Sequence, residues 1–264
     1  MPERAVYVLL DDYGWQRYAA GSRAAELDLD LAAGPASALR RIREQQKTEQ
    51  WSDDVWCESA VLVDQPHKVL LFFTTHTTGY AHRAALLTTL AHTWPEWEVR
   101  WAYDGLADLL AYLGLDRAEV RTEHSVIDPA AAEDDPDQLV SVVRESGEID
   151  AYAVRPAIDE VLALGPECVD LLPEDAKVTE CDLPRSGVHI DIPAKTIGLW
   201  TMDAFCGLPD KLAWPGWQVG TWADRYPDHL EKCKVTCPEW HLTDGLRTLV
   251  DRARALGSRP AQDS

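Results

Sequence analysis

The sequence predicts an α+β protein made of two pseudo-repeated halves, and three observations lead to this prediction. Ser59–Lys68 aligns without gaps on Ser186–Lys195. A Trp-Pro-x-Trp-x-Val pattern occurs at Trp94–Val99 and again at Trp214–Val219, in the same order along the chain. Finally, strand-like and helix-like segments alternate in the same way around both matches. Collinear repeats of this kind indicate a repeated structural unit, here with a mainly antiparallel sheet and helices packed on one face.

In the first half, Pro at an opening turn and apolar residues at helical spacing predict a helix over 35–46. Two β-branched and aromatic runs separated by a turn-like segment predict a hairpin, Val61–Asp64 with Val69–Thr74. Helical periodicity returns over Tyr80–His92. Trp97–Tyr103 alternates as a strand does, and a short helix over Gly105–Leu113 ends at a glycine.

The second half repeats this plan. A helix is expected over 156–164, followed by a hairpin of Val188–Asp191 with Thr196–Thr201. Gly207 and Pro209 interrupt the next segment, so its helix should be truncated or broken. A last helix is expected to run from Pro238 to Leu256.

These elements predict a first α+β repeat over residues 1–127, an acidic linker over 128–137, a second repeat over 138–257 and a loose tail over 258–264. Two such halves often meet about a pseudo-twofold axis. A cleft between them is therefore where a ligand site would first be sought.

Charge and composition exclude some classes of partner. The 264 residues include 45 acidic and 25 basic side chains, a formal net charge of −20, and no basic cluster is evident. Such a chain repels phosphate backbones and anionic lipids, which argues against nucleic acid and membrane partners. No apolar run approaches the length of a spanning helix, and the amino terminus lacks a signal-peptide pattern, so we expect a cytoplasmic protein with reduced cysteines and no cofactor.

Tryptophan is the most distinctive residue type, with 11 copies against 3 phenylalanines. Indole rings suit ligand stacking and interface hot spots, and equally suit wedging a helix against a sheet. Because the residues recur at equivalent points of the repeat, we favour the packing role. The candidates are Trp94, Trp97, Trp101, Trp214, Trp217 and Trp222.

Aspartates are also retained between the halves. Asp64 matches Asp191, and Asp104 matches Asp224. Paired carboxylates can perform acid–base chemistry or hold a metal ion. Asp64 and Asp191 each lie two residues before a proline in a predicted turn, where an aspartate side chain accepts backbone N–H groups. Asp104 and Asp224 precede short predicted helices, as capping residues do. We therefore favour folding roles for all four.

Cys233, Cys237 and His241 form a C-x3-C-x3-H series with ligand types that zinc accepts. Pro238 argues against all three lying on one helical face, and no second close ligand pair exists. We therefore expect no metal, with this series as the weak candidate.

His189 lies two residues before Asp191 on one predicted strand, hence on the same face. Such a pair can act as a general base or form a hydrogen-bonded structural pair. The chain has no G-x-S-x-G, no G-x-G-x-x-G and no H-E-x-x-H pattern.

We accordingly expect a non-catalytic cytoplasmic protein that binds another protein, in an inhibitory, immunity-like or regulatory role towards a basic partner. Charge complementarity would speed such association. The alternative is an enzyme or small-molecule binder whose site lies between the halves and uses the tryptophans, His189 and the paired aspartates.

Overall fold

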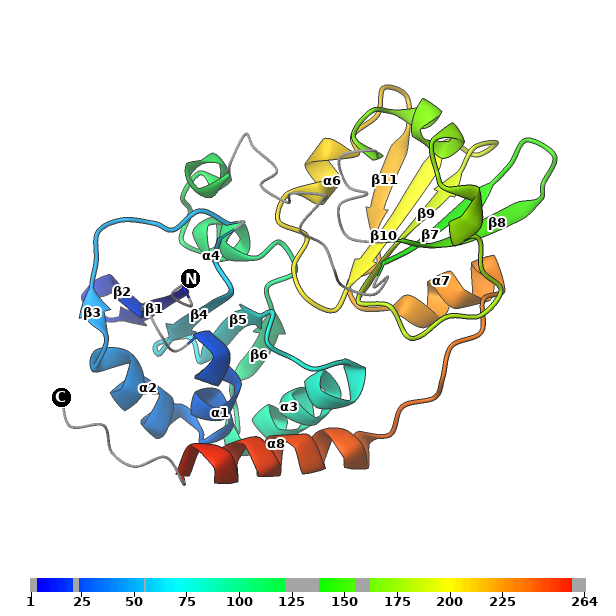
Figure 1. Cartoon of the computed structure of the whole chain (residues 1–264). Coiled ribbons are helices and arrows are strands. Elements are labelled where there is room, and N and C mark those ends of the chain that lie inside the picture. Colours follow the sequence, from blue (N-terminus) through cyan, green and yellow to red (C-terminus); the bar gives the residue numbers. More distant parts are fainter. Residues whose placement is uncertain (1–3, 21–23, 55, 122–137, 155–161, 258–264) are drawn as a thin grey trace. The chain divides into compact units, whose positions relative to one another are not determined.

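The structure is a computed structural model that describes residues 4–20, 24–54, 56–121, 138–154 and 162–257. The chain divides into two units, residues 1–121 with 240–264 and residues 122–239. Each unit contains one β-sheet with its own helices, so the fold is α+β (Figure 1). None of the helices within these described ranges has the length and apolar character needed to cross a bilayer.

The first unit contains a sheet of six strands in the order β3-β2-β1-β4-β5-β6. The predicted hairpin is confirmed as the antiparallel pair β4 and β5. The strands are β1 (Ala5–Asp11), β2 (Gly14–Ala20), β3 (Gln46–Lys47), β4 (Ser59–Asp64), β5 (Val69–Thr74) and β6 (Glu98–Trp101). The helices are α1 (Leu27–Ala32), α2 (Pro35–Arg43), α3 (Tyr80–Thr93) and α4 (Leu106–Tyr112), with single 3-10 turns at Ala24–Glu26 and Arg117–Val120.

Antiparallel pairs outnumber parallel ones in the first sheet, as expected, but the sheet also contains parallel contacts that the sequence did not predict. Strand β1 runs parallel to β4, and β5 runs parallel to β6. The physical reason is the connection between the strands: α3 lies between β5 and β6 along the chain, and a crossover of that kind returns the chain to the same end of the sheet. The sheet is therefore mixed.

The expectation that the helices of each half pack on one face of its sheet is wrong for the first unit. Every side chain of β4 and β5 is buried, which requires cover on both faces of the sheet. Figure 1 shows α1, α2 and α3 on one side of the first sheet and α4 on the other. Polar atoms on these strands consequently need partners inside the protein.

The second unit contains a sheet of five strands in the order β11-β10-β9-β7-β8. Its strands are β7 (Gln138–Val143), β8 (Ile149–Val154), β9 (Ser186–Asp191), β10 (Thr196–Thr201) and β11 (Gln218–Thr221). Its helices are α6 (Leu208–Lys211) and α7 (Tyr226–Cys233), with 3-10 turns at Pro166–Asp170 and Glu174–Ala176. The four-residue α6 confirms that the helix before the second Trp-Pro segment is truncated.

The two sheets share one connectivity. In each, two antiparallel hairpins meet through a parallel contact, and a further strand adds in parallel, so that β2-β1-β4-β5-β6 matches β8-β7-β9-β10-β11. Local details recur as well: Tyr18 faces Lys47 across a bridge as Tyr152 faces Lys177, and in both pairs the ammonium lies 5.8 Å from the ring centre.

Three predicted segments are outside the described residues. These are the acidic linker over 128–137, the tail over 258–264, and nearly all of the helix expected over 156–164.

The last helix, α8 (Leu242–Gly257), differs from the prediction in two ways. It begins four residues after Pro238. It also belongs to the first unit, where it packs on α3, and not to the second repeat in which the sequence analysis placed it. Gly245 permits the close approach, because a Cβ at that position would lie 1.8 Å from the carbonyl oxygen of Ala81 on α3.

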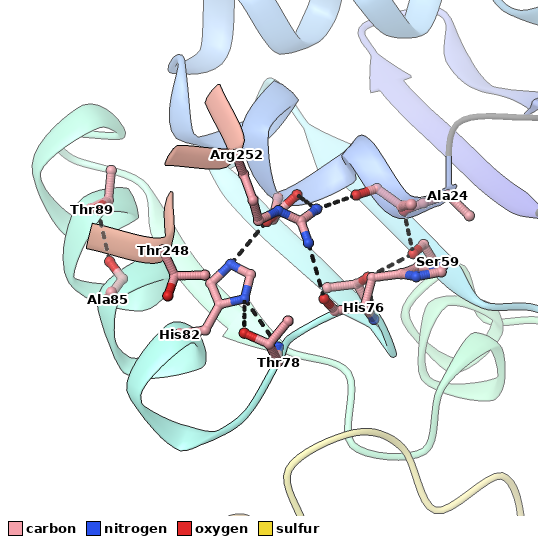
Figure 2. A network of polar contacts seen from close by, with 12 residues as sticks. Ala24, Ser59, His76, Thr78, His82, Ala85, Thr89, Thr248 and Arg252 are labelled. Atoms are coloured by element: carbon pink, nitrogen blue, oxygen red, sulfur yellow. Dashed lines mark hydrogen bonds and ion pairs between the residues drawn. The ribbon is translucent and has the colours of Figure 1, made fainter. Parts of the chain in front are cut away.

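A buried polar network fixes α8 in place (Figure 2). Arg252 on α8 donates hydrogen bonds to the carbonyls of Ala25 and His76 and to the buried carboxylate of Asp28, at 3.1 Å for the last. Asp28 also pairs with Nε2 of His82 at 3.0 Å, while Nδ1 of that ring accepts the Thr78 N–H. The His82 proton therefore lies on Nε2 and points at Asp28.

Replacing Gly245 with alanine tests this docking. In a solvent-exposed helix this change would raise the free energy of unfolding by about 1 kcal/mol. Here the clash with Ala81 should instead lower it by about 1 to 3 kcal/mol. Chemical denaturation measures the difference. Gly220→Ala is the control, since a Cβ there meets nothing closer than 4.0 Å. A stabilised Gly245→Ala protein would show that α8 does not pack on α3.

Candidate functional site

The six candidate tryptophans do not form one cluster. In the first unit the buried Trp94 donates from Nε1 to the carbonyl of Leu31 at 2.7 Å, and its ring meets Trp97 edge to face at 4.9 Å. The second unit repeats both contacts, Trp214 to the carbonyl of Leu162 at 3.0 Å and Trp214 to Trp217 at 4.9 Å. In each unit the first tryptophan of the Trp-Pro-x-Trp pattern is thus bound to a carbonyl far away in the sequence, and the second packs against the first. Trp101 packs on Phe72, and Trp222 lies beside His189, with ring centres 5.0 and 5.9 Å apart.

The retained aspartates of the two hairpins are turn residues, as expected. Asp64 accepts the backbone N–H of His67 at 3.0 Å, and Asp191 accepts that of Ala194 at 2.9 Å. Burial opposes ionisation of Asp64, but hydrogen bonds from His67 and Tyr112 outweigh it and lower the pKa of the carboxyl. Each carboxylate thus holds its own turn, and Asp64 also accepts the hydroxyl of Tyr112 on α4.

The second pair does not cap helices, which corrects the prediction. Gly105 and Arg225 occupy the cap positions of α4 and α7, without a side-chain cap bond. Asp104 instead pairs with Arg117 at 3.3 Å and with Arg121, which also binds the buried Asp54.

The cysteine series does not assemble as a metal site among the described residues, where no group of three or more His, Cys, Asp and Glu side chains is placed to hold an ion. Cys233 is buried in an apolar cluster with Leu139 and Val235. Cys237 lies 3.7 Å, sulfur to sulfur, from Cys181. His241 belongs to the other unit.

His189 belongs to a buried polar network that the sequence did not reveal. Ser141 on β7 lies between two imidazoles, with its Oγ 2.7 Å from Nδ1 of His189 and 2.6 Å from Nε2 of His229 on α7. Nδ1 of His229 faces Nε1 of Trp200 at 2.8 Å. The adjacent Asp191, predicted as the partner of His189, is not part of this chain of bonds.

The direction of every proton in the network follows from Trp200. An indole N–H only donates, so Nδ1 of His229 accepts and its Nε2 carries the proton. That proton is donated to Ser141, whose hydroxyl in turn donates to Nδ1 of His189. The network is thus ordered from Trp200 to His189 with both rings neutral.

Burial keeps the rings neutral. The pKa of His189 is lowered to about 4 and that of His229 to about 3, with burial as the largest cause in both cases. Lys232 contributes to the lowering at both rings and His189 to that at His229, while Asp191 partly offsets it at His189. Ser141 and His229 are fully buried. A serine nucleophile must reach a substrate carbonyl, whereas this hydroxyl is enclosed between a sheet and a helix. Among the described residues no carboxylate is hydrogen-bonded to either imidazole to orient it as a base. The arrangement therefore suits a structural network better than acyl transfer.

Two glycines make room for these side chains. A Cβ at Gly187 would lie 2.4 Å from Nε1 of Trp200 and 2.6 Å from Nδ1 of His229. A Cβ at Gly198 would lie 2.0 Å from the ring of Trp222.

The equivalent layer of the first unit is apolar. Strand register and the alignment of α4 with α7 place Val8, Leu62, Leu71, Phe73 and Leu109 where the second unit has Ser141, His189, Gly198, Trp200 and His229. All five apolar side chains are buried. The fold therefore does not require a polar layer at this place.

A second site, which the sequence analysis missed, lies at the edge of the first sheet. Tyr13 at the β1–β2 turn is 98% exposed and Trp15 is 40% exposed. Arg17, two residues further on β2, is only 4% exposed, and its guanidinium carbon lies 4.1 Å from the ring centre of Trp51 and 5.8 Å from that of Trp15. Alternation of Tyr13, Trp15 and Arg17 was visible in the sequence, but exposure of a turn tip and enclosure of a cation are set by tertiary packing.

Beside these residues β2 is open. Strand β3 pairs only with Tyr18 and Ala19, so within the described part of the chain no strand pairs with the outer edge of Gly14–Gln16. An unpaired strand edge is a template for another chain. Comparisons with protein-family models, with curated proteins and with solved structures find no match to this chain.

The histidine network predicts a specific pH response. Both rings have a lower pKa folded than unfolded, so the unfolded chain binds more protons below about pH 6.5, and stability falls as the pH drops from there towards about 4. NMR of the ring carbons should show His189 and His229 neutral at pH 5.5. Titration of either ring with a midpoint near 6.5 would show that solvent reaches the network.

Removing the central hydroxyl should destabilise the second unit. Ser141→Ala leaves a donor on His229 and an acceptor on His189 unpaired, at a cost of about 1 to 3 kcal/mol in the free energy of unfolding. Denaturation of Ser146→Ala supplies the control: it removes only a solvent-exposed hydrogen bond from the Glu148 N–H, and the free energy of unfolding should differ from that of the parent protein by about 0.5 kcal/mol or less. Rapid labelling of Ser141 in the parent protein by a fluorophosphonate would instead favour the enzyme alternative.

Proposed function

We propose that this protein acts without catalysis, in the cytoplasm, by binding another protein that it inhibits, neutralises or regulates. The observation that carries the proposal is the exposed aromatic tip of Tyr13 and Trp15, next to the outer edge of Gly14–Gln16 on β2, with which none of the described strands pairs. Aromatic side chains of this kind are frequent anchors of protein interfaces, and an open edge offers main-chain hydrogen bonds.

The charge argues for a basic partner. A net charge of −20 raises the encounter rate with a basic protein and disfavours acidic ones. Binding should therefore weaken as salt is added, because salt screens the long-range attraction.

We further infer that the two units arose by duplication. The shared strand order, the repeated indole-to-carbonyl bonds of Trp94 and Trp214, and the repeated tyrosine–lysine pairs support common descent. Residues that differ between the copies then mark where function has specialised. Trp15 and Arg17 are such residues, since strand register places Ile149 and Ala151 at the equivalent positions.

Capture of partners from the native cell tests the protein-binding proposal. A basic protein should bind at low salt and less at moderate salt, and the double variant Tyr13→Ser/Trp15→Ser should lose about tenfold or more of the captured protein. Leu164→Ser and Leu171→Ser are matched controls, because both leucines are well exposed in the second unit.

Three outcomes would contradict the proposal. They are capture of nothing at either salt, capture that ignores salt, and equal capture by the double variant. Turnover of a small molecule by the purified protein would support the alternative, an enzyme or small-molecule binder.

A further inference from the structure

Two cysteines of the second unit lie close enough to react with each other. The sulfur atoms of Cys181 and Cys237 are 3.7 Å apart, and one thiol donates a hydrogen bond to the other. Both residues are partly exposed, and both are free thiols. They are 56 residues apart in the sequence, so the fold brings them together.

The backbone around the pair sets this geometry. Glu180 and Thr236 form a parallel bridge. In it the N–H of Thr236 donates to the carbonyl of Thr179, and the N–H of Cys181 donates to that of Thr236, each at 3.1 Å. The two cysteines directly follow the bridged residues, so they occupy neighbouring positions on adjacent segments. Paired segments run about 4.8 Å apart, and a disulfide spans Cα separations of about 4.4 to 6.8 Å.

We propose that Cys181 and Cys237 are a reversible disulfide site, at which a hydroperoxide joins the two sulfurs without unfolding the second unit. The sulfurs must approach each other from 3.7 Å to a bonded distance of about 2.05 Å. Rotation of the side chains supplies a movement of that size, because the backbone segments are already at the separation that the bond requires. The closed loop would contain β9, β10, β11 and α7.

The peroxide alone balances the reaction. The thiolate of Cys237 attacks one peroxide oxygen, the O–O bond breaks, and the released alkoxide or hydroxide takes up the proton that the thiol lost. The sulfur of Cys181 then attacks the sulfur of the resulting sulfenic acid, and the hydroxyl group leaves as water with the Cys181 proton. Two thiols are thereby oxidised to one disulfide, and the peroxide is reduced to water and an alcohol, or to two waters.

The order of attack follows from the hydrogen bond between the thiols. Burial raises the pKa of both, that of Cys181 to about 12, and a hydrogen bond from Cys181 partly offsets the effect at Cys237. Cys237 therefore reacts first, because the thiolate is the nucleophile. Since few thiolates form at neutral pH, the pair stays reduced in a reducing compartment and closes under sustained oxidation.

Cys233 is the competing partner for either cysteine. It belongs to the apolar cluster against which Cys181 and Cys237 pack. Its side chain is buried, and its thiol donates to the carbonyl of Leu230 at 3.8 Å. We therefore expect the disulfide to leave Cys233 reduced.

Peptide mapping of oxidised protein tests the proposal. The folded full-length protein is treated with hydrogen peroxide at mildly alkaline pH, free thiols are alkylated, and the chain is digested for mass spectrometry. Peptides linked through Cys181 and Cys237 should account for most of the disulfide, and dithiothreitol should separate them. Cys181→Ser and Cys237→Ser should abolish the linkage. Cys206→Ser, which removes another partly exposed thiol of the same unit, should retain it.

Thermal unfolding gives a second readout. A bond that closes a loop of this length restricts the unfolded chain, so oxidation should raise the unfolding temperature of the parent protein by about 5 °C or more. The same treatment of the Cys237→Ser protein should produce no such rise.

Four results would overturn the inference. These are no linked peptides from the folded parent protein, a bond that uses Cys233, linkage only between chains, and an oxidised protein no more stable than the reduced one. If a serine variant fails to fold, the peptide map and the unfolding temperature of the parent protein decide. The inference is independent of the protein-binding proposal, because both cysteines lie in the other unit from Tyr13 and Trp15.

Discussion

Burial of the central strands on both faces is the constraint from which the other features of each unit follow. Strands β4 and β5 expose no side chain, and the central strands of the second sheet are nearly as enclosed. Water cannot serve the polar atoms placed there, so each needs an internal partner or must be absent. The same enclosure explains why β4 and β5 read as almost continuous apolar runs.

The two units meet this constraint differently. The first fills the layer beneath α4 with apolar side chains such as Leu62 and Leu109. The second places Ser141, His189 and His229 beneath α7 and satisfies them through an ordered chain of hydrogen bonds ending at Trp200. Such a network rigidifies a core when complete and is costly when one member is lost. It accounts for the burial of the neutral His189 ring.

Against this background Arg17 is an exception, though not the only one among the described residues. It is as buried as the histidines, but its Nε and Nη1 have no hydrogen-bond partner there, and Nε of Arg252 is in the same position. The ring centre of Trp51 lies 4.1 Å from the guanidinium carbon of Arg17, and such stacking stabilises the cation without using its donors.

Periodicity and repetition in the sequence determined the central hairpin of each unit, the helix over α3, the truncated α6 and the turn roles of Asp64 and Asp191, because these depend on neighbours along the chain. A further repeat was present but unnoticed, Leu31–Pro35 against Leu162–Pro166, with Gly34 and Gly165 both at positive φ. Tertiary structure alone decided the parallel contacts, the return of α8 to the first unit, the Ser141 network and the enclosure of Arg17. Each of these joins residues far apart in sequence, whose pairing is fixed by packing and by the need to satisfy buried polar atoms, and neither requirement leaves a local pattern.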